Sequence, residues 1–427
     1  MRHIHNISLT LLAVLALAGC SETEVVPDVP GDTLHSISFN TGDGAEKVTR
    51  VDKTVGLQTL DINEIKVYGY KTLTTTADDG TTTTTLQNVM PGYTLRYLDG
   101  TANSSTSNTT GWEYVGLTTT DASNNTVPVT DYLGKEQEIK YWDGNSSDYR
   151  FFGVIPNDSY PLLYDGSAID KNTTIDDTKS FSMEFKNLTY MTRKLDTTGK
   201  NYVYYKQNTA TVVQEKDIPI YGTMWQGDPK DNYDKPVVLA FSKPYALVRL
   251  VFIRPDGSSV TQLGDPGKTA GEDGYYSAKF NPKNETYIST DGSVNVKWSM
   301  KGTEESTTVT SSDAKMPAMQ FEPIELTESE KRYQAWPEYV MVPTTTTSSS
   351  VDYLCTVFVK ASTTSGNNTT TQVEQRKAYV PKEFTHWKAG YEYTYVFKIT
   401  YNNSLEFSHV VETYTKWQAG YVNETTW

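Results

Sequence analysis

The residues that could hold a metal ion or act as nucleophiles are few and widely separated along the chain. Beyond residue 20 the histidines are His35, His386 and His409, and no two of them stand at the spacing of zinc ligands. Cys355 stands alone, without a catalytic motif around it, and no Gly-x-Ser-x-Gly sequence occurs. We therefore expect no metal, no cofactor and no enzymatic activity, with Cys355 filling a buried strand position.

Two further stretches partly match ligand-binding motifs. Residues 267–269 read Gly-Lys-Thr, like the end of a phosphate-binding loop, but Gln262 stands where the first glycine of that loop belongs. Residues 143–147 read Asp-Gly-Asn-Ser-Ser, which is similar to the start of a calcium loop but lacks its central glycine and closing glutamate. We expect a plain loop at the first stretch and a solvated turn at the second.

The 427-residue chain carries a formal net charge of −14 and is rich in residues that favour strands. Aromatic residues make up 12% of it, whereas disordered chains contain few of them. Long runs of Thr, Ser and Asn supply the polarity, and Thr, Tyr and Val favour β structure. Because an acidic chain repels phosphate backbones, nucleic acid is not an expected partner.

The first twenty residues form a targeting signal. A basic stretch around Arg2 precedes an apolar run from Ile7 to Leu17, which is too short to span a membrane. The run ends in Leu-Ala-Gly-Cys, which resembles the lipobox of bacterial lipoproteins, where the signal is removed before the cysteine and the thiol is acylated. We expect a signal peptide over residues 1–19, lipidation of Cys20 (by palmitate or a similar chain) and a flexible tether over residues 20–33. The alternative is a plain secretory signal with an incidental cysteine.

Beyond the tether the pattern is one of short strands and turns. Apolar side chains alternate from Ile62 to Tyr70 and, most regularly, from Tyr393 to Tyr401. A Thr-rich run over residues 72–85 is interrupted by an Asp-Gly pair, which is typical of a β-hairpin. Only residues 325–336 are expected to be helical, from their capping-box spacing. The sequence therefore predicts an all-β fold.

Length and turn composition predict two domains. At ~100–200 residues per domain, the chain is too long for a single core. Residues 227–232 are rich in turn formers, and apolar strands follow at residues 237–241 and 246–253. We expect tandem β-sandwich domains, the N-terminal one over residues 34–230 and the C-terminal one over residues 231–427.

Arg50 stands where cleavage would have a structural effect. It follows a candidate first strand, Leu34 to Phe39, and precedes the rest of the N-terminal domain. Cleavage between Arg50 and Val51 would separate that strand and leave a sheet with an open edge, which is a template for a strand of another chain. For an isolated arginine, a solvated residue beside a strand is the simpler interpretation.

Several motifs, taken together, resemble those of one family. A lipobox, one strand, a Thr-Arg pair and then strand-rich domains look like the fimbrillins, the type V pilins of Bacteroidales. Residues 140–156 are similar to the family's Trp…Tyr-x-Phe-Phe-x-x-x-Pro region, and residues 387–395 to its Trp-x-x-Gly-x-x-Tyr-Thr-Tyr motif. Residues 217–222 resemble the end of its first domain and residues 238–250 the start of its second.

The resemblance implies a mechanical role. Members are exported as lipoproteins to the outer membrane, an arginine-specific protease removes the first strand of shaft subunits, and the C-terminal strand of a neighbour fills the vacated groove. For this chain it implies transthyretin-like β-sandwich domains, processing at Arg50 and Val51, and a cell-surface fimbrium whose other pilin subunits are its partners.

The donor strand implied by the resemblance lies in residues 405–417. Leu405, Phe407, Val411 and Trp417 have the same parity along a strand there, as side chains that fill a hydrophobic groove require. The other interpretation is that this segment is the last strand of its own domain. The chain would then be a tip or anchor subunit.

A rival function from another class is a glycan-binding surface lipoprotein of a polysaccharide-uptake system. Such proteins are also β-sandwiches on a lipid tether, and the surplus of Tyr and Trp could stack on sugar rings. Strand periodicity instead places many of these aromatics in pleated faces, as over residues 393–401. A binder of this kind would stay lipidated and monomeric, and cleavage at Arg50 would not change its activity.

Overall fold

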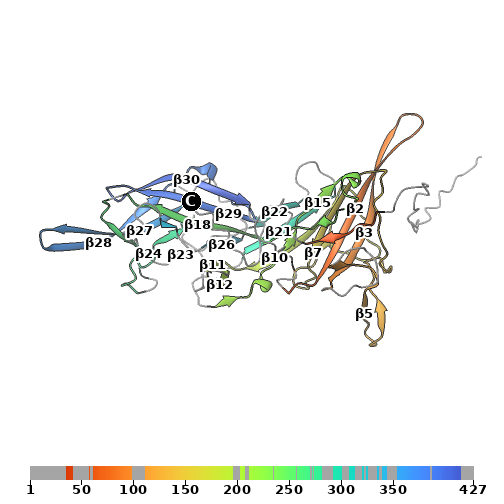
Figure 1. Cartoon of the computed structure of the whole chain (residues 1–427), viewed down its shortest axis with the longest axis horizontal. Coiled ribbons are helices and arrows are strands. Elements are labelled where there is room, and N and C mark those ends of the chain that lie inside the picture. The colour runs from red at the N-terminus through yellow and green to blue at the C-terminus, as the bar shows by residue number, and fades with distance from the viewer. Residues whose placement is uncertain are drawn as a thin grey trace, which may run out of the picture. The chain divides into compact units, whose positions relative to one another are not determined.

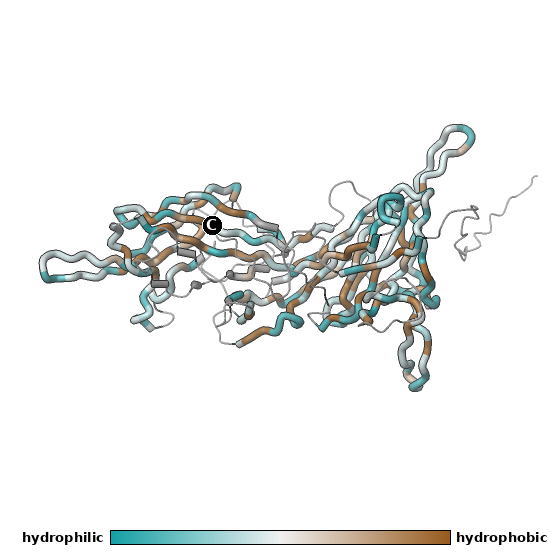
Figure 2. The backbone as a smooth tube through the Cα atoms, viewed as in Figure 1, coloured by the Kyte–Doolittle hydropathy of each residue, from teal (hydrophilic) through white to brown (hydrophobic). Residues whose placement is uncertain are grey.

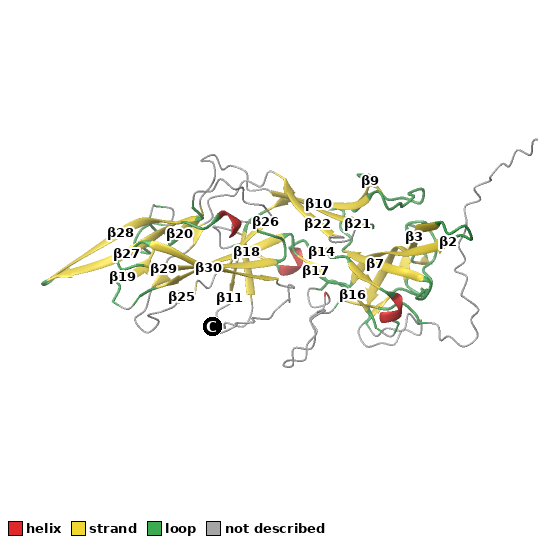
Figure 3. Cartoon of the chain, turned by 90° about the horizontal axis from the view of Figure 1, so that it is seen from above, coloured by secondary structure: helices red, strands yellow, loops and turns green. Residues whose placement is uncertain are grey.

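The chain is described by a computed structural model, in which nearly all regular structure is β-strand (Figure 1). The helical turns η2 (Glu215–Asp217), η3 (Pro229–Asp231) and η5 (Lys382–Phe384) are only three residues each (Figure 3). The predicted all-β fold is confirmed. Within the described part of the chain, no helix has the length and apolar character needed to cross a membrane. The structure describes residues 35–41, 57, 61–98, 111–195, 202–206, 211–233, 235–255, 257–269, 272, 274–280, 292–300, 307–312, 320–321, 324–325, 334–335, 339–343, 353–384 and 387–414.

A seven-stranded sheet contains the earliest described strand of the chain. Its order is β15 (Trp225–Gly227), β7 (Ser146–Val154), β2 (Glu64–Thr76), β3 (Thr82–Tyr97), β4 (Trp112–Glu113), β1 (Phe39–Asn40) and β16 (Val237–Val238). Successive residues of β7 point into different cores, because side chains alternate along a strand. Phe151 packs with Ile65 and Val67 in one core, and Phe152 packs with Tyr68 in another. Both faces of this sheet are therefore buried.

A five-stranded sheet packs on the seven-stranded sheet through aromatic side chains. The Phe152 ring stacks on Trp298 at 4.9 Å between centroids and meets Phe181 at 5.2 Å. Offset and tilted pairs of this kind add about 0.5–1.5 kcal/mol each beyond the area they bury. The strand order is β22 (Thr307–Ser312), β21 (Gly292–Ser299), β10 (Ser180–Leu188), β8 (Leu163–Tyr164) and β9 (Ser167–Ala168).

The remaining large sheets form a sandwich around a third core. One has the order β13 (Val212–Val213), β12 (Tyr202–Lys206), β11 (Met191–Leu195), β26 (Tyr339–Pro343), β18 (Tyr245–Ile253), β29 (Tyr391–Ile399) and β30 (Leu405–Tyr414), with β25 (Gln334–Ala335) also paired to β18. The other has the order β23 (Gln320–Phe321), β20 (Ala278–Phe280), β27 (Cys355–Ser365), β19 (Val260–Leu263) and β24 (Ile324–Glu325), with β28 (Asn368–Ala378) paired to β27. Smaller ladders join β14 (Tyr221–Gly222) to β17 (Phe241–Ser242) and β5 (Thr118–Thr120) to β6 (Thr126–Pro128).

The alternation predicted near the C-terminus is confirmed within β29. Tyr393, Tyr395, Phe397 and Ile399 are all buried in the third core. Tyr401 lies beyond the end of the strand, in the turn before β30, and is 76% exposed. The shared face therefore stops at Ile399.

Two Thr-rich hairpins extend beyond the cores. The β2–β3 hairpin turns at the predicted Asp-Gly pair, where Gly80 has a φ of +82° that a residue with a Cβ rarely adopts. Thr pairs such as Thr75 with Thr83 continue the ladder of this hairpin into solvent. The outer part of β27–β28 is likewise exposed on both strands. Both tips are pale or teal in Figure 2, whereas brown segments alternate with pale ones along the strands of the cores.

Strand pairings run across residue 230, the predicted domain boundary. The parallel pair of Phe39 with Val237 crosses it, and so do the antiparallel ladders of β10 with β21 and β11 with β26. The described residues cluster as one compact unit that begins at His35. The division into domains 34–230 and 231–427 stays a prediction.

The predicted helix over residues 325–336 is wrong at both ends. Glu325 ends strand β24 and Gln334 begins strand β25, and the residues between them lie outside the described part of the chain. The capping-box residues, 327 and 330, lie in that undescribed stretch, whereas pairing with β19 and β18 gives strand at residues 325 and 334–335.

The close approach of β14 to β7 gives a testable expectation about the fold. A Cβ on Gly222 would lie 2.2 Å from the backbone oxygen of Gly153, so either strand must move to admit it. We expect Gly222→Ala to lower the free energy of unfolding by about 1–3 kcal/mol in urea titrations. Gly267→Ala is the matched control, because a Cβ there meets only the Asp265 carboxylate at 3.2 Å. Equal losses for both variants would contradict the close packing of the two strands.

Candidate functional site

The predicted site residues fall into two groups. Cys20, Arg50, Val51 and Trp417 lie outside the described residues, so lipidation and processing stay predictions. The candidate first strand is described from His35, and the candidate donor strand contributes Leu405, Phe407 and Val411, all in β30.

Residues 35–41, here called the inserted segment, are built into the core that lies under the seven-stranded sheet. Ile37 is 0% exposed and Phe39 is 2% exposed, and both belong to this core. Complete burial of an aliphatic or aromatic side chain contributes roughly 1.5–3 kcal/mol. The alternation of Ile37, Ser38 and Phe39 therefore anchors the segment by two side chains on one face.

Backbone hydrogen bonds hold the inserted segment along both of its edges. On one edge the Ile37 amide donates to the Lys140 carbonyl at 2.7 Å, and the Trp142 amide donates to the His35 carbonyl at 2.9 Å. On the other edge the amides of Val237 and Leu239 donate to Ser38 and Asn40 at 2.7 and 2.8 Å, respectively. The segment is an interior strand. Its removal would leave unpaired groups on both neighbours.

Aromatic side chains form the wall around Phe39. The rings of Tyr114 and Phe151 meet it edge-on, with centroids 6.1 and 5.4 Å away. The Tyr114 hydroxyl donates to the Ile37 carbonyl at 2.9 Å and accepts from the Lys140 amide at 3.1 Å. Burial raises the pKa of the Tyr114 phenol, so the hydroxyl stays protonated and remains a donor at neutral pH.

The strands that flank the inserted segment have their own supports. The buried Gln137 amide accepts from the Thr94 amide and donates to the carbonyls of Thr94 and Tyr114, which ties residue 114 to β3. On the other side, the Thr223 amide donates to the Ala240 carbonyl at 2.8 Å just after β16. These bonds do not involve residues 35–41, so they would survive loss of the segment.

The two ends of the inserted segment are held differently. At one end the His35 ring stacks on Tyr233 with centroids 4.6 Å apart and an interplanar angle of 7°. At the other end Thr41 is buried, and its hydroxyl oxygen accepts from the Leu57 amide at 3.4 Å. Residues 42–56 lie outside the described part of the chain, but the residues that bracket them are in contact. The two ends of the connection that contains Arg50, at Thr41 and Leu57, therefore lie next to each other.

The candidate donor strand β30 pairs antiparallel with β29 of its own chain. It is the last strand of its sheet, so among the described strands none pairs with its outer edge. A bulge between Phe407 and His409 shifts the register, and Val410 rather than Val411 joins Leu405 and Phe407 on the third core. In this arrangement Val411 therefore does not share the face of Leu405 and Phe407, because the extra residue in the bulge reverses the alternation. The donor role of the segment stays a prediction.

The other stretches with ligand-binding signals have local structural roles. The Asp143 carboxylate accepts from Lys71 Nζ at 3.1 Å and from the Asn145 amide at 2.9 Å, which organises a turn. Burial acts to raise the Asp143 pKa, but the hydrogen bonds from Asn145 and Lys71 and the charge of Lys71 together outweigh burial and lower the pKa. Cys355 is buried, and desolvation raises its thiol pKa. In the described ranges no three His, Cys, Asp or Glu side chains come together as metal ligands.

Comparisons with known proteins give only a distant likeness. No family model and no curated protein matches the chain. A solved structure named "putative cell adhesion protein", from Bacteroides uniformis, is 12% identical and covers 90% of this chain and 99% of its own, with a TM-score of 0.26. Structures of the same name from Bacteroides ovatus (12% identity, 91% and 98% covered) and Parabacteroides distasonis (10% identity, 89% and 96% covered) both have a TM-score of 0.27. At such TM-scores the likeness supports no inference about this chain.

Sequence reasoning did not find the neighbours of the inserted segment. Tyr114, Gln137 and β16 lie roughly 75 to 200 residues further along the chain, and no short-range pattern links them to Phe39. The Trp…Tyr-x-Phe-Phe stretch was the one available signal, since it supplies Trp142 and Phe151 to the same core.

The burial of Phe39 gives the second testable expectation. Phe39→Ala should lower the free energy of unfolding by about 3–5 kcal/mol, because it opens a cavity between Tyr114 and Phe151. Phe384→Ala is the matched control, since that ring is 41% exposed and should cost much less. The measurement is the unfolding midpoint in urea. If the two variants lose the same stability, the inserted segment is not part of the core.

Proposed function

We propose that this protein is a structural subunit of a surface fimbria, assembled by exchange of one strand for another. The observation that carries the proposal is the inserted segment, a buried strand paired along both edges that is joined to the rest of its sheet through the candidate cleavage position. A strand placed in this way can be replaced by an equivalent strand of another chain. The role is mechanical, with no enzymatic step performed by this chain and no cofactor.

Processing at Arg50 would break the covalent link between the inserted segment and the body of the protein. An arginine-specific protease would add water across the Arg50–Val51 amide, leaving a carboxylate on Arg50 and an amine on Val51. The same cut would detach Cys20 and its acyl chain, which hold the exported precursor at the outer membrane until assembly. The body would then belong to the fimbrium on the cell surface.

Burial favours transfer of β30 into the vacated position of a second copy. Leu405 and Phe407 are only half-buried on their own core. In the second copy they would take the places of Ile37 and Phe39, which are fully buried. Completing the burial of such side chains gains on the order of 1 kcal/mol each. The backbone would gain a second paired edge as well, because β30 now pairs only with β29 among the described strands.

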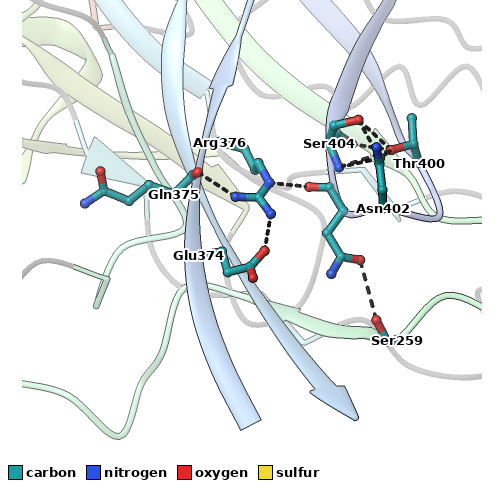
Figure 4. A network of polar contacts seen from close by, with 8 residues as sticks. Ser259, Glu374, Gln375, Arg376, Thr400, Asn402 and Ser404 are labelled. Carbon is teal, nitrogen blue, oxygen red and sulfur yellow. Dashed lines mark hydrogen bonds and ion pairs between the residues drawn. The ribbon is translucent and has the colours of Figure 1, made fainter.

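The turn before β30 is held by hydrogen bonds of its own and by a contact with Arg376 (Figure 4). The Asn403 amide donates to the Thr400 carbonyl, and the Thr400 amide donates to the Ser404 carbonyl, both at 2.9 Å. Arg376 of β28 donates through Nε to the Asn403 carbonyl at 2.9 Å. The donor strand would therefore pivot from a turn that is fixed to its own domain.

Loss of the cleavage position tests the proposal most directly. Arg50→Ala and Arg50→Lys should both remain folded, lipid-anchored monomers, because an arginine-specific protease cuts neither, and cells producing them should lack fibres by electron microscopy. Lys53→Ala is the control, since it removes a neighbouring cation and leaves the Arg50–Val51 bond intact. Normal fibres from the Arg50 variants would refute the cleavage role, and selective binding of polysaccharide by the monomer would favour a glycan-binding lipoprotein.

Donation by β30 can be tested separately from acceptance. Phe407→Ala should give a chain that accepts a strand but donates poorly, so adding it to processed wild-type protein should shorten the oligomers seen on native gels. Glu406→Ala, an exposed neighbour on the same strand, should leave their length unchanged. Full-length ladders from Phe407→Ala alone would show that another segment is donated.

A further inference from the structure

We infer that the inserted segment stays bound after its covalent link to the body has been cut, so that an incoming strand meets an occupied position and has to displace it. The inference rests on the proposed function, because it concerns the step between processing and assembly. It makes the strands around residues 35–41 a binding site for a free extended peptide. Cleavage then permits strand exchange but does not empty the position of residues 35–41, which becomes vacant only while the incoming strand replaces the segment.

Every described contact of the inserted segment lies upstream of the cut. The four interstrand amide–carbonyl bonds, the Tyr114 hydroxyl and the burial of Ile37 and Phe39 all involve residues 35–41. None of these atoms is changed by hydrolysis between Arg50 and Val51. The flanking strands are also held by bonds of their own, through Gln137 and Thr223, and keep their shape.

The covalent link between the inserted segment and the body favours binding of the segment only by keeping its local concentration high. Because Thr41 and Leu57 are in contact, the connection between them closes a short loop. Cutting such a loop turns an intramolecular contact into a bimolecular one and removes an effective concentration in the millimolar range. A strand held by two buried side chains and by hydrogen bonds on both edges dissociates slowly even without that contribution.

Displacement is expected to start at the Thr41 end. Cutting separates this end from Val51, and its described ties to the body are the 3.4 Å bond from Leu57 to Thr41 and the 2.8 Å bond from Leu239 to the Asn40 carbonyl. The His35 end is held by the 2.9 Å bond from Trp142 and by the stack on Tyr233. An incoming strand would pair first beside Thr41 and then replace the segment toward His35, so that few backbone groups are unpaired at any moment.

The site selects peptides by pattern. Ile37 and Phe39 fill it as an aliphatic residue followed two positions later by an aromatic one, with a parallel partner in β16. Leu405 and Phe407 of β30 repeat this order. The predicted ligand is therefore an extended, mostly uncharged segment with an aliphatic-x-Phe pattern, and residues 404–411 of a second copy are the natural probe.

The experiment follows the excised fragment after processing. The chain that begins at Cys20, in detergent and with a fluorophore on its N-terminal amine, is cut by an arginine-specific protease and passed through gel filtration at once; it has no arginine before Arg50. We expect the fragment to co-elute with the body and to be released faster as the concentration of a synthetic peptide of residues 404–411 rises. Separate elution of the fragment, or release at a rate independent of peptide concentration, would overturn the inference.

Matched variants assign the retention to the inserted segment. Phe39→Ala should speed release of the fragment at least ~100-fold. Tyr114→Phe, which keeps the ring and removes only the hydroxyl, should speed it about 5–10-fold and covers the case in which Phe39→Ala does not fold. Ser38→Ala, between the two anchoring side chains, should release like the wild type. Equal release from all of these variants would contradict retention through residues 35–41.

Failure of this inference can be told apart from failure of the proposed function. Retention is read from co-elution of the fragment, and assembly is read from oligomer ladders of the same sample. A fragment that leaves at once while ladders form would refute retention and keep strand exchange. A retained fragment with no ladder at any concentration would support the peptide site and refute assembly by exchange.

Discussion

The need to pair a buried strand on both edges governs the arrangement of the sheet around residues 35–41. An interior strand must satisfy its amides and carbonyls on two sides, and here the partners are β4 and residues 140–142 on one side and residues 237–239 on the other. The chain therefore brings together segments that are about a hundred residues apart before the sheet is complete. The Phe39 side chain lies where these segments meet, in contact with Tyr114 and Phe151.

The pairing of the inserted segment with β16 also links the cores to one another. β16 completes the pairing of the inserted segment, and a few residues later the chain enters β18, which is the parallel partner of β29. The aromatic contact of Phe152 with Trp298 joins the sheets on either side of the second core. A segment near the start of the chain is thus packed by elements from beyond residue 230, and strand order along the sequence does not follow strand order in space.

Local patterns in the sequence predicted elements well and partners poorly. The Asp-Gly turn of the β2–β3 hairpin and the buried face from Tyr393 to Ile399 could be found because both are set by neighbouring residues. The parallel pair of Phe39 with Val237 could not, because nothing local specifies which distant edge a strand will join. The bulge in β30 was missed for a related reason. An inserted residue reverses the alternation without leaving a mark in the hydrophobic pattern, and Val410 takes the place expected for Val411. In the candidate site, Ile37 and Phe39 could be identified as strand residues, but the walls that surround them could not.

The composition of the β27–β28 hairpin has an electrostatic consequence. The chain as a whole carries a charge of −14, yet the stretch from Ala361 to Val373 contains no Lys, Arg, Asp or Glu. Like charges on two copies repel each other over a screening length of about 8 Å at physiological ionic strength. This exposed hairpin is therefore a part of the surface where two copies can approach with little repulsion, and contacts made through it would change little with salt concentration.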